Sequence, residues 1–427
     1  MGADPLESID RILDIAREFV RMDIAFVSRW HDDVQEFAHV SGESSTFGVT
    51  VGGSLPLDGS FCVRVMDGRI RSAVPDASAE PEVRDLAVTH AARLGSYVGV
   101  PVRFSDGDFF GMLCCVSHEA SQELGPRDVR FLEMISDLVA ERLELDRAER
   151  QQREDIERRT NGAIAAEAFD VYLQPIVRLA DLTTVGYEAL ARFHGALART
   201  PDVWFNESAS VGLGPALDLA VVGTALRTLS SIPAGVYLSV NVTPETLGDR
   251  RLATLLQPYG RRLVVEVTEH AEIEDYRKLA HAAAPIRARG VRLAVDDAGA
   301  GFATFRHIVQ LAPDIIKADI TLTRGVDHDP ARRALVRALV GFAQDTSAIL
   351  VSEGVETKAE RDTLMDLGVT VGQGYLLGRP APPNSWFGQP PVSRRRMRVS
   401  PSSPVPDRPT RRRPAATTAV VPAGSPT

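Results

Sequence analysis

The sequence predicts an α/β protein with a C-terminal (β/α)8 TIM-like barrel and, before it, a smaller α+β domain. The second half of the chain alternates eight apolar, strand-like segments with amphipathic, helix-like segments, which is the count that such a barrel requires. Polar side chains recur within those strands or at their downstream ends. The first 145 residues instead contain apolar segments paired across short turns, a pattern typical of an antiparallel sheet.

The composition is that of a soluble globular protein. Of the 427 residues, 44% are hydrophobic and 25% are charged. No apolar run reaches the roughly 20 residues that span a bilayer, and residues 1–13 carry acids instead of a basic signal-peptide segment. We therefore expect a cytoplasmic protein. The three cysteines, Cys62, Cys114 and Cys115, are too few for a disulfide framework and lack the spacing of a zinc site.

Charge is distributed unevenly along the chain. The net charge is −9, yet residues 393–427 contain eight Arg and one Asp, a net of +7, so the other 392 residues carry −16. An acidic folded part argues against nucleic-acid binding, and no stable nucleic-acid or membrane partner is expected. Residues 391–427, rich in Pro and Arg, should form a disordered tail. Its Arg clusters leave open a contact with RNA or an anionic membrane surface, although a solvated tail is the simpler interpretation.

The first domain begins with a predicted helix over residues 8–22, whose apolar side chains fall on one face. Four predicted strands follow, at residues 24–30, 36–41, 95–102 and 109–117. Turns at Asp32-Asp33 and at Asp106-Gly107-Asp108 connect them as two hairpins.

Paired strands followed by a closing helix resemble the GAF family of sensory domains, over residues 1–145. The resemblance implies an antiparallel sheet packed against helices, and a small molecule or other signal that acts there; the ligand is unknown. Cys62 invites a bilin-binding or redox interpretation, but a cysteine beside Phe61 is more often buried packing. The same holds for Cys114 and Cys115 within their apolar strand.

A long helix is predicted after the first domain. Pro126 suits a first helical turn, and apolar residues recur at helical spacing as far as Leu143. Half of residues 146–165 are charged, and this segment forms a predicted helical linker. Two interpretations stay open: a solvated linker, or a helix that pairs in parallel with a second copy and couples the two domains. The second makes a homodimer the expected assembly.

The barrel is predicted over residues 166–390. Its eight strands are residues 171–177, 186–193, 236–242, 262–269, 291–297, 315–319, 348–356 and 369–378. Amphipathic helices separate most of them, at residues 215–231, 276–289, 330–344 and 358–367.

Polar residues mark successive strands of this barrel: Glu188, Asn241, Glu266, Asp296, Asp297, Lys317, Asp319 and Glu353. In a barrel the downstream strand ends meet at one face, where catalytic groups are placed. Carboxylates gathered there would repel one another and have raised pKa values unless divalent cations, which prefer oxygen ligands, neutralised them. A solvated turn would explain Asp296 and Asp297 beside Gly299 and Gly301, but not the whole set.

Short motifs recur at the same strand ends. Glu188-Ala189-Leu190 is followed by Arg192, and further motifs come in order: QPIV (174–177), NVTPETL (241–247), EVTE (266–269), DDAGAG (296–301), IKAD (316–319), EGVE (353–356) and QGYLLGRP (373–380). Together they resemble the EAL family of cyclic di-GMP phosphodiesterases, whose name comes from the first of these motifs.

That resemblance implies a phosphodiesterase that cleaves cyclic di-GMP to linear pGpG with two Mg²⁺ or Mn²⁺ ions. The implied metal ligands are Glu188, Asn241, Glu266, Asp296 and Asp297, with Asp296 as the bridge. Glu353 is implied as the general base for the attacking water, and Lys317 as the residue that orients this water. The implied substrate contacts are Gln174, Leu190, Arg192, Asp319 and Gln373, and the supporting residues are Glu269, near the metal-bearing loop, and Glu356.

One segment departs from the family pattern. The usual DDFGTGYSSL reads DDAGAGFATF at residues 296–305, so Ala298 and Ala300 replace Phe and Thr. Both aspartates and both glycines remain, whereas an aromatic ring and a hydroxyl that would brace the loop are lost. Because no implied ligand or base is missing, the sequence favours an active enzyme over a receptor that binds cyclic di-GMP without cleaving it. A scaffold driven by the GAF-like domain, whose barrel only presents a dimer face, is a further alternative.

Overall fold

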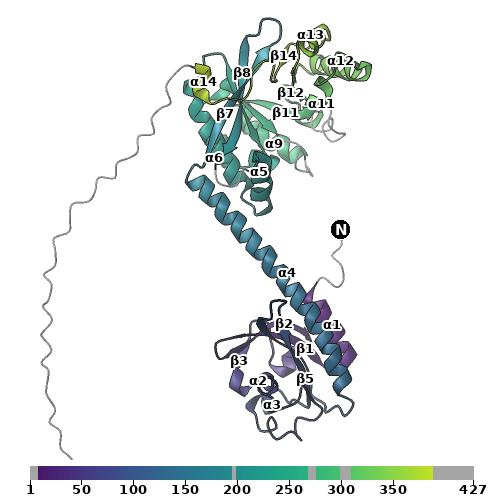
Figure 1. Cartoon of the computed structure of the whole chain (residues 1–427). Helices are drawn as coiled ribbons and strands as arrows, with labels where there is room; N and C mark the ends of the chain where they lie inside the picture. The colour runs from purple at the N-terminus through teal and green to yellow at the C-terminus, as the bar shows by residue number, and fades with distance from the viewer. Residues whose placement is uncertain (1–7, 195–198, 268–275, 299–308, 388–427) are drawn as a thin grey trace, which may run out of the picture.

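The structure, a computed structural model, describes residues 8–194, 199–267, 276–298 and 309–387. These residues form an α+β domain and an α/β barrel, which are joined by one long helix (Figure 1). The predicted tail and the loop at residues 299–305 lie outside them. None of the helices in these four ranges is both long enough and apolar enough to cross a bilayer.

The first domain is a six-stranded antiparallel sheet with the strand order β3-β2-β1-β6-β5-β4. Its strands are β1 (Ile24–His31), β2 (Val34–Gly42), β3 (Ser54–Pro56), β4 (Ala73–Val74), β5 (Ser96–Arg103) and β6 (Phe109–Ser117). Both predicted hairpins, β1–β2 and β5–β6, are confirmed. Asp32 takes a left-handed backbone conformation, φ 50°, in the first of these turns, as Asp tolerates better than most residues.

Helices cover both faces of this sheet. On one face α1 (Ile9–Val20) and the start of α4 (Pro126–Ala165) pack on residues such as Val27 and Cys115. The opposite face holds α2 (Phe61–Met66) and α3 (Ala87–Ala91), with Tyr97 and Cys114 in their shared core. Because successive strand residues point to opposite faces, the neighbours Cys114 and Cys115 belong to different cores.

The predicted helix after the first domain is confirmed as α4, a single helix of 40 residues. Pro126 occupies its first turn, and the Asp128 carboxylate accepts a hydrogen bond from the Gly125 backbone N–H at 3.0 Å. Its first turns bury Leu132, Ile135 and Val139 against the first domain. Its last turns contact the barrel helices α5 (Pro201–Ser210) and α6 (Gly214–Leu226).

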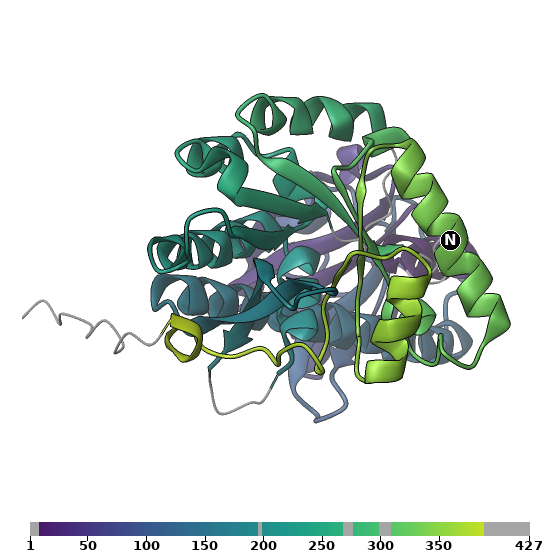
Figure 2. The ribbon, with the colours of Figure 1, turned by 90° about the horizontal axis from the view of Figure 1, so that it is seen from above.

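The second domain is the predicted closed barrel of eight strands. They are β7 (Phe169–Arg178), β8 (Thr184–Phe193), β9 (Tyr237–Val242), β10 (Leu263–Val267), β11 (Arg292–Ala298), β12 (Ile315–Ala318), β13 (Ile349–Ser352) and β14 (Val371–Gly372). The further helices include α7 (Pro244–Leu247), α8 (Arg250–Leu256), α9 (Tyr276–Arg287), α11 (Ile320–Thr323), α12 (Pro330–Asp345), α13 (Lys358–Asp366) and α14 (Pro383–Phe387). The longer helices lie outside the strands (Figure 2).

The first barrel strand departs from the regular pattern of parallel strands. β7 runs antiparallel to both of its neighbours, β8 and β14. Only five residues separate it from β8, too few for the crossover helix that a parallel connection needs. The resulting register sets Gln174 opposite Glu188, so β7 still contributes a side chain to the level of the predicted site.

Candidate active site

Lys317 lies at the centre of the predicted site and is almost completely buried, with 1% of its surface exposed. Its Nζ atom is 2.6 Å from Glu353 Oε1, 2.7 Å from Glu266 Oε2, 3.2 Å from Asp296 Oδ1 and 3.7 Å from Glu188 Oε2. The structure therefore places one buried ammonium among four of the predicted carboxylates.

Strand register explains why these residues meet. Glu188, Asn241, Glu266, Asp296 and Lys317 come from the consecutive strands β8 to β12, and Glu353 directly follows β13. Adjacent strands in this part of the barrel are parallel, and Asn241 is the register partner of Glu266. Residues at matched levels of parallel strands converge at the downstream face of a barrel, as the sequence pattern predicted.

The charges of the cluster are strongly coupled. Burial alone would lower the pKa of the Lys317 ammonium, but attraction to the four carboxylates outweighs burial and holds this pKa well above its ordinary value. Burial raises the pKa of Glu266 to about 8, with repulsion from Glu188 and Asp296 adding to the effect and Lys317 opposing it. The pKa of Glu353 is raised in the same direction, chiefly by burial. A proton or a further cation would therefore be favoured here.

Amides complete the wall around Glu188. Asn241 Nδ2 donates to Glu188 Oε1 at 2.9 Å, and Gln373 Nε2 donates to Glu188 Oε2 at 2.6 Å and to Gln174 Oε1 at 3.0 Å. The side-chain oxygens of two of these amides, Asn241 Oδ1 and Gln373 Oε1, are buried and accept no hydrogen bond from the described residues. A buried oxygen without a donor is an available ligand for a hard cation.

The donor set fits oxygen-preferring divalent cations in its chemistry. Glu188, Glu266 and Asp296 supply carboxylates, and Asn241 supplies the unpartnered amide oxygen. Across the described ranges no three acidic, His or Cys side chains already form a closed ligand set. The Lys317 ammonium lies within 3.7 Å of the carboxylates of Glu188, Glu266 and Asp296.

Two cavities adjoin the cluster and share Leu190 and Asp296 in their walls. The first, of about 400 Å³, is lined by Glu188, Asp296, Lys317 and Glu353 of the cluster, together with Gln174, Asp319, Arg324, Glu356, Gln373 and Tyr375. The second, of about 370 Å³, has a more apolar wall that includes Phe205 and Val221, with Arg192, Asp202 and Asn241 as polar groups. The structure thus brings all five predicted substrate contacts to the walls of these two cavities.

The remaining predicted residues lie at the edge of the site or outside the described residues. The Asp319 carboxylate caps α11 by accepting from the Thr321 N–H at 2.8 Å, and Glu356 pairs with Arg324 at 2.6 Å. Glu269 and the side chain of Asp297 are outside the described part of the chain, so their predicted roles stay predictions.

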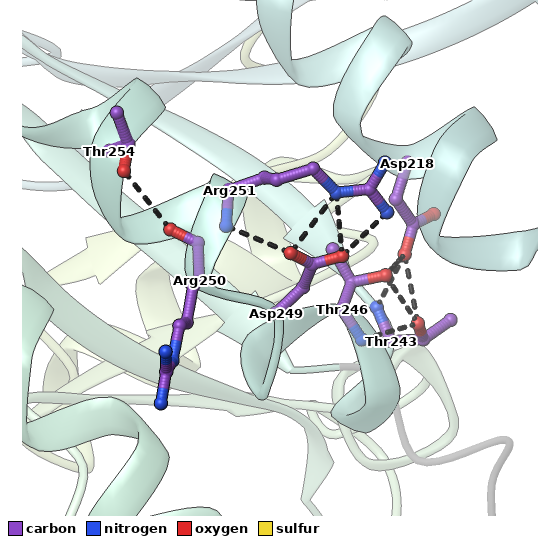
Figure 3. A network of polar contacts seen from close by, with 7 residues as sticks. All are labelled: Asp218, Thr243, Thr246, Asp249, Arg250, Arg251 and Thr254. Atoms are coloured by element: carbon purple, nitrogen blue, oxygen red, sulfur yellow. Dashed lines mark hydrogen bonds and ion pairs between the residues drawn. The ribbon is translucent and has the colours of Figure 1, made fainter.

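The sequence analysis did not predict two residues, Ser239 and Asp218, that hold parts of the site in place. Ser239 Oγ donates to Glu266 Oε1 at 2.5 Å. Because Ser239 lies two residues before Asn241 in the same strand, both side chains point to the same face, and this spacing could have predicted Ser239 as a site residue. Asp218, on α6, accepts from the Thr243 N–H and Oγ1, both at 2.9 Å, and from Thr246 Oγ1 at 2.6 Å (Figure 3). It thereby fixes the turn directly after Asn241. No local pattern pointed to Asp218.

Comparisons with known proteins agree with this architecture. Residues 157–380 match the EAL domain family, and residues 4–143 match the GAF domain family. The cyclic di-GMP phosphodiesterase RocR of Pseudomonas aeruginosa is 30% identical over 226 residues, which are 50% of this chain and 58% of the relative. An uncharacterized signaling protein of Caulobacter vibrioides is 30% identical over 302 residues, 68% of this chain and 36% of that protein.

A solved structure gives the same result for the barrel. The phosphodiesterase PaMucR in complex with c-di-GMP superposes with a TM-score of 0.50 at 25% sequence identity, covering 54% of this chain and 99% of that one. The chain spans only 36% and 58% of the lengths of the two relatives described above.

Proposed function

Because the chain belongs to the EAL domain family and carries a GAF domain before its barrel, we propose that it hydrolyses cyclic di-GMP to linear pGpG with divalent metal ions. One observation carries the proposal: the buried cluster of Glu188, Glu266, Asp296, Glu353 and Lys317 at the downstream face of the barrel. Relatives that are named as cyclic di-GMP phosphodiesterases support the choice of substrate.

In this proposal the ligands of two Mg²⁺ or Mn²⁺ ions are Glu188, Asn241, Glu266, Asp296 and Asp297. Such a pair of ions supplies Lewis-acid activation of water and neutralises charge on the transferring phosphate. Glu353 takes the proton of the attacking water, which requires that the burial and the carboxylate repulsion that raise its pKa be offset. Lys317, 2.6 Å from Glu353, orients that carboxylate and the water.

The two adjoining cavities suit a substrate with two nucleotide halves joined by phosphodiesters. Their shared wall at Leu190 and Asp296 lies beside the cluster, where the scissile phosphate would bind. Arg192 lines the second cavity, and the two parallel N–H donors of its guanidinium match the spacing of phosphate oxygens. Gln174, Gln373 and Asp319 line the first cavity and would contact the substrate there.

Regulation by the GAF domain, a cytoplasmic location and a homodimer complete the proposal. The last turns of α4 contact α5, whose Pro201, Asp202 and Phe205 line the second cavity. A change in the first domain that moves α4 therefore has a direct route to the cavity wall.

The deciding experiment measures conversion of cyclic di-GMP to pGpG by the full chain with Mg²⁺ or Mn²⁺. The near-isosteric variant Glu353→Gln should lose about 10²–10⁴-fold in kcat, because the water loses its base, while substrate binding persists. Glu154→Gln, on an exposed position of α4, is the matched control and should retain turnover. Tight binding by the wild type without product at any metal concentration would identify a receptor instead.

A further inference from the structure

Two cysteines that lie far apart in the sequence meet in the core of the first domain. Cys62 Sγ, on α2, is 3.4 Å from Cys114 Sγ, on β6. The Tyr97 hydroxyl, on β5, is 3.5 Å from Cys62 Sγ and 3.3 Å from Cys114 Sγ. All three side chains are buried. Cys62 is a buried packing residue, as the sequence analysis expected, and its thiol also contacts that of a second cysteine.

Surrounding residues keep this cluster compact. A Cβ atom on Gly99 would lie 2.1 Å from the Tyr97 hydroxyl and 2.9 Å from Cys114 Sγ, so only glycine leaves room for the tyrosine to reach the thiols. Gln35 is 1% exposed, and its Oε1 accepts no hydrogen bond from the described residues. Cys115, the third cysteine, packs on the opposite face of the sheet.

The two thiols differ in acidity. Burial would raise the pKa of Cys62, but hydrogen bonds from Cys114, Tyr97 and Gln35 outweigh it and lower this pKa below its ordinary value. Burial raises the pKa of Cys114 well above its ordinary value. Thiolate is the nucleophilic form of cysteine, so Cys62 is the better nucleophile and Cys114 the natural partner to resolve its oxidation product.

We propose that Cys62 and Cys114 form a thiol pair that a hydroperoxide oxidises to an intramolecular disulfide between α2 and β6. The Cys62 thiolate attacks the O–O bond, forming a sulfenic acid and releasing hydroxide when hydrogen peroxide is the oxidant. The Cys114 thiol then attacks the Cys62 sulfur and releases water. With the proton that Cys62 first gave up, two thiols and one peroxide yield one disulfide and two waters.

The test treats the full reduced chain with hydrogen peroxide, quenches with catalase, denatures the protein and alkylates its free thiols. Mass spectrometry should count one alkylated cysteine where the untreated chain has three, and proteolysis should release a peptide pair joined through Cys62 and Cys114. Cys115→Ser is the matched control; it should still form this disulfide, with its two alkylatable thiols falling to none. Cys62→Ser should keep both remaining thiols. Cys114→Ser should keep only the Cys115 thiol, because Cys62 is still oxidised to a sulfenic acid but has no partner for a disulfide.

Mapping of the wild type decides the matter even if a serine variant fails to fold. Three alkylated cysteines after peroxide treatment would overturn the proposal. The control is the protein unfolded in denaturant, whose cysteines must be oxidised under the same conditions to show that the peroxide is active. A disulfide that includes Cys115, or Cys62 oxidised to a sulfinic or sulfonic acid without a disulfide, would also overturn it. Tyr97→Phe should slow disulfide formation severalfold, since the hydroxyl that supports the Cys62 thiolate is gone.

Discussion

Lys317 is the residue on which the charge balance of the barrel depends. Four carboxylates lie within 3.7 Å of its Nζ atom, and the side chain has almost no contact with solvent. Charges removed from water interact strongly, so loss of one partner leaves the others uncompensated. The ammonium is thus a structural cation of the metal-free protein as well as a proposed participant in hydrolysis.

This arrangement predicts the effect of replacing the ammonium by an apolar chain of similar length. Lys317→Met should destabilise the metal-free protein by about 3–5 kcal/mol, the usual result of breaking a buried ionic network. Denaturant unfolding in a chelator-containing buffer at neutral pH measures the loss. Manganese should restore part of the lost stability by binding the uncompensated carboxylates.

Lys358→Met is the control for this change, because Lys358 is exposed at the start of α13. It should alter stability by less than about 0.5 kcal/mol. Equal stability of Lys317→Met and wild type without metal would show that the carboxylates are neutralised by protons and not by the lysine.

At the scale of the element, Glu360 links two segments that border the first cavity. Its carboxylate accepts from the backbone N–H groups of Gly325 and Glu356 at 3.0 Å and of Thr357 at 2.9 Å. It also completes the capping box of α13. Burial would raise its pKa, but these backbone donors outweigh burial and lower the pKa below its ordinary value.

The cap has a pH dependence whose sign follows from this shift. A carboxyl with a lowered folded-state pKa stabilises the fold above its unfolded pKa, and the contribution is lost as pH falls through the folded value. Glu360→Gln should therefore be about 1 kcal/mol less stable than wild type at pH 7, and the difference should shrink as pH falls below about 4.5. Denaturant midpoints at several pH values test this, with Glu154→Gln as the control. A difference that is constant with pH would rule out the carboxylate charge as its source.

At the scale of the whole molecule, α4 is the continuous element that joins the two domains (Figure 1). Near its end, Arg159 forms an ion pair with Glu207 and lies over the Trp204 ring at 5.8 Å. Trp204 in turn stacks on Phe193, with 4.8 Å between ring centroids, next to Arg192 in the second cavity. A chain of direct contacts therefore links the end of α4 to the wall of the second cavity, so that a rotation of α4 would displace residues of that wall.

Insertions into the exposed part of α4 distinguish a coupling helix from a passive linker. Seven Glu, Arg and Ala residues between Gln151 and Gln152 rotate the first domain by only about 20°, whereas two such residues rotate it by about 160°. We expect the two-residue insertion to change turnover of cyclic di-GMP about fivefold or more relative to the seven-residue insertion. Circular dichroism should confirm equal helicity per residue in both.

Equal turnover in the wild type and both insertion variants would favour the solvated-linker interpretation. Size-exclusion chromatography with light scattering, applied to the wild type and both insertion variants, measures their molar masses and so tests the predicted homodimer. The division of the chain at residues 145 and 165 remains a prediction, because one helix runs through both positions.

The sequence alone determined the longer elements and the level of most site residues, but it did not predict the short elements β3, β4, α2 and α3 of the first domain. Strand and helix periodicities are local properties, so the barrel, the antiparallel first domain and α4 were all predictable. Glu188, Asn241, Glu266, Asp296 and Lys317 were predictable for a related reason: parallel strands carry residues at their downstream ends to one common face.

Only the tertiary structure decided which side chains touch. The antiparallel course of β7, the central place of Lys317 among four acids, the support that Asp218 gives to the turn after Asn241, and the contact of Cys62 with Cys114 all join distant segments. Hydrophobic periodicity specifies which face of an element is buried, but not the partner that it meets. Packing and register choose those partners, because they depend on the whole domain at once.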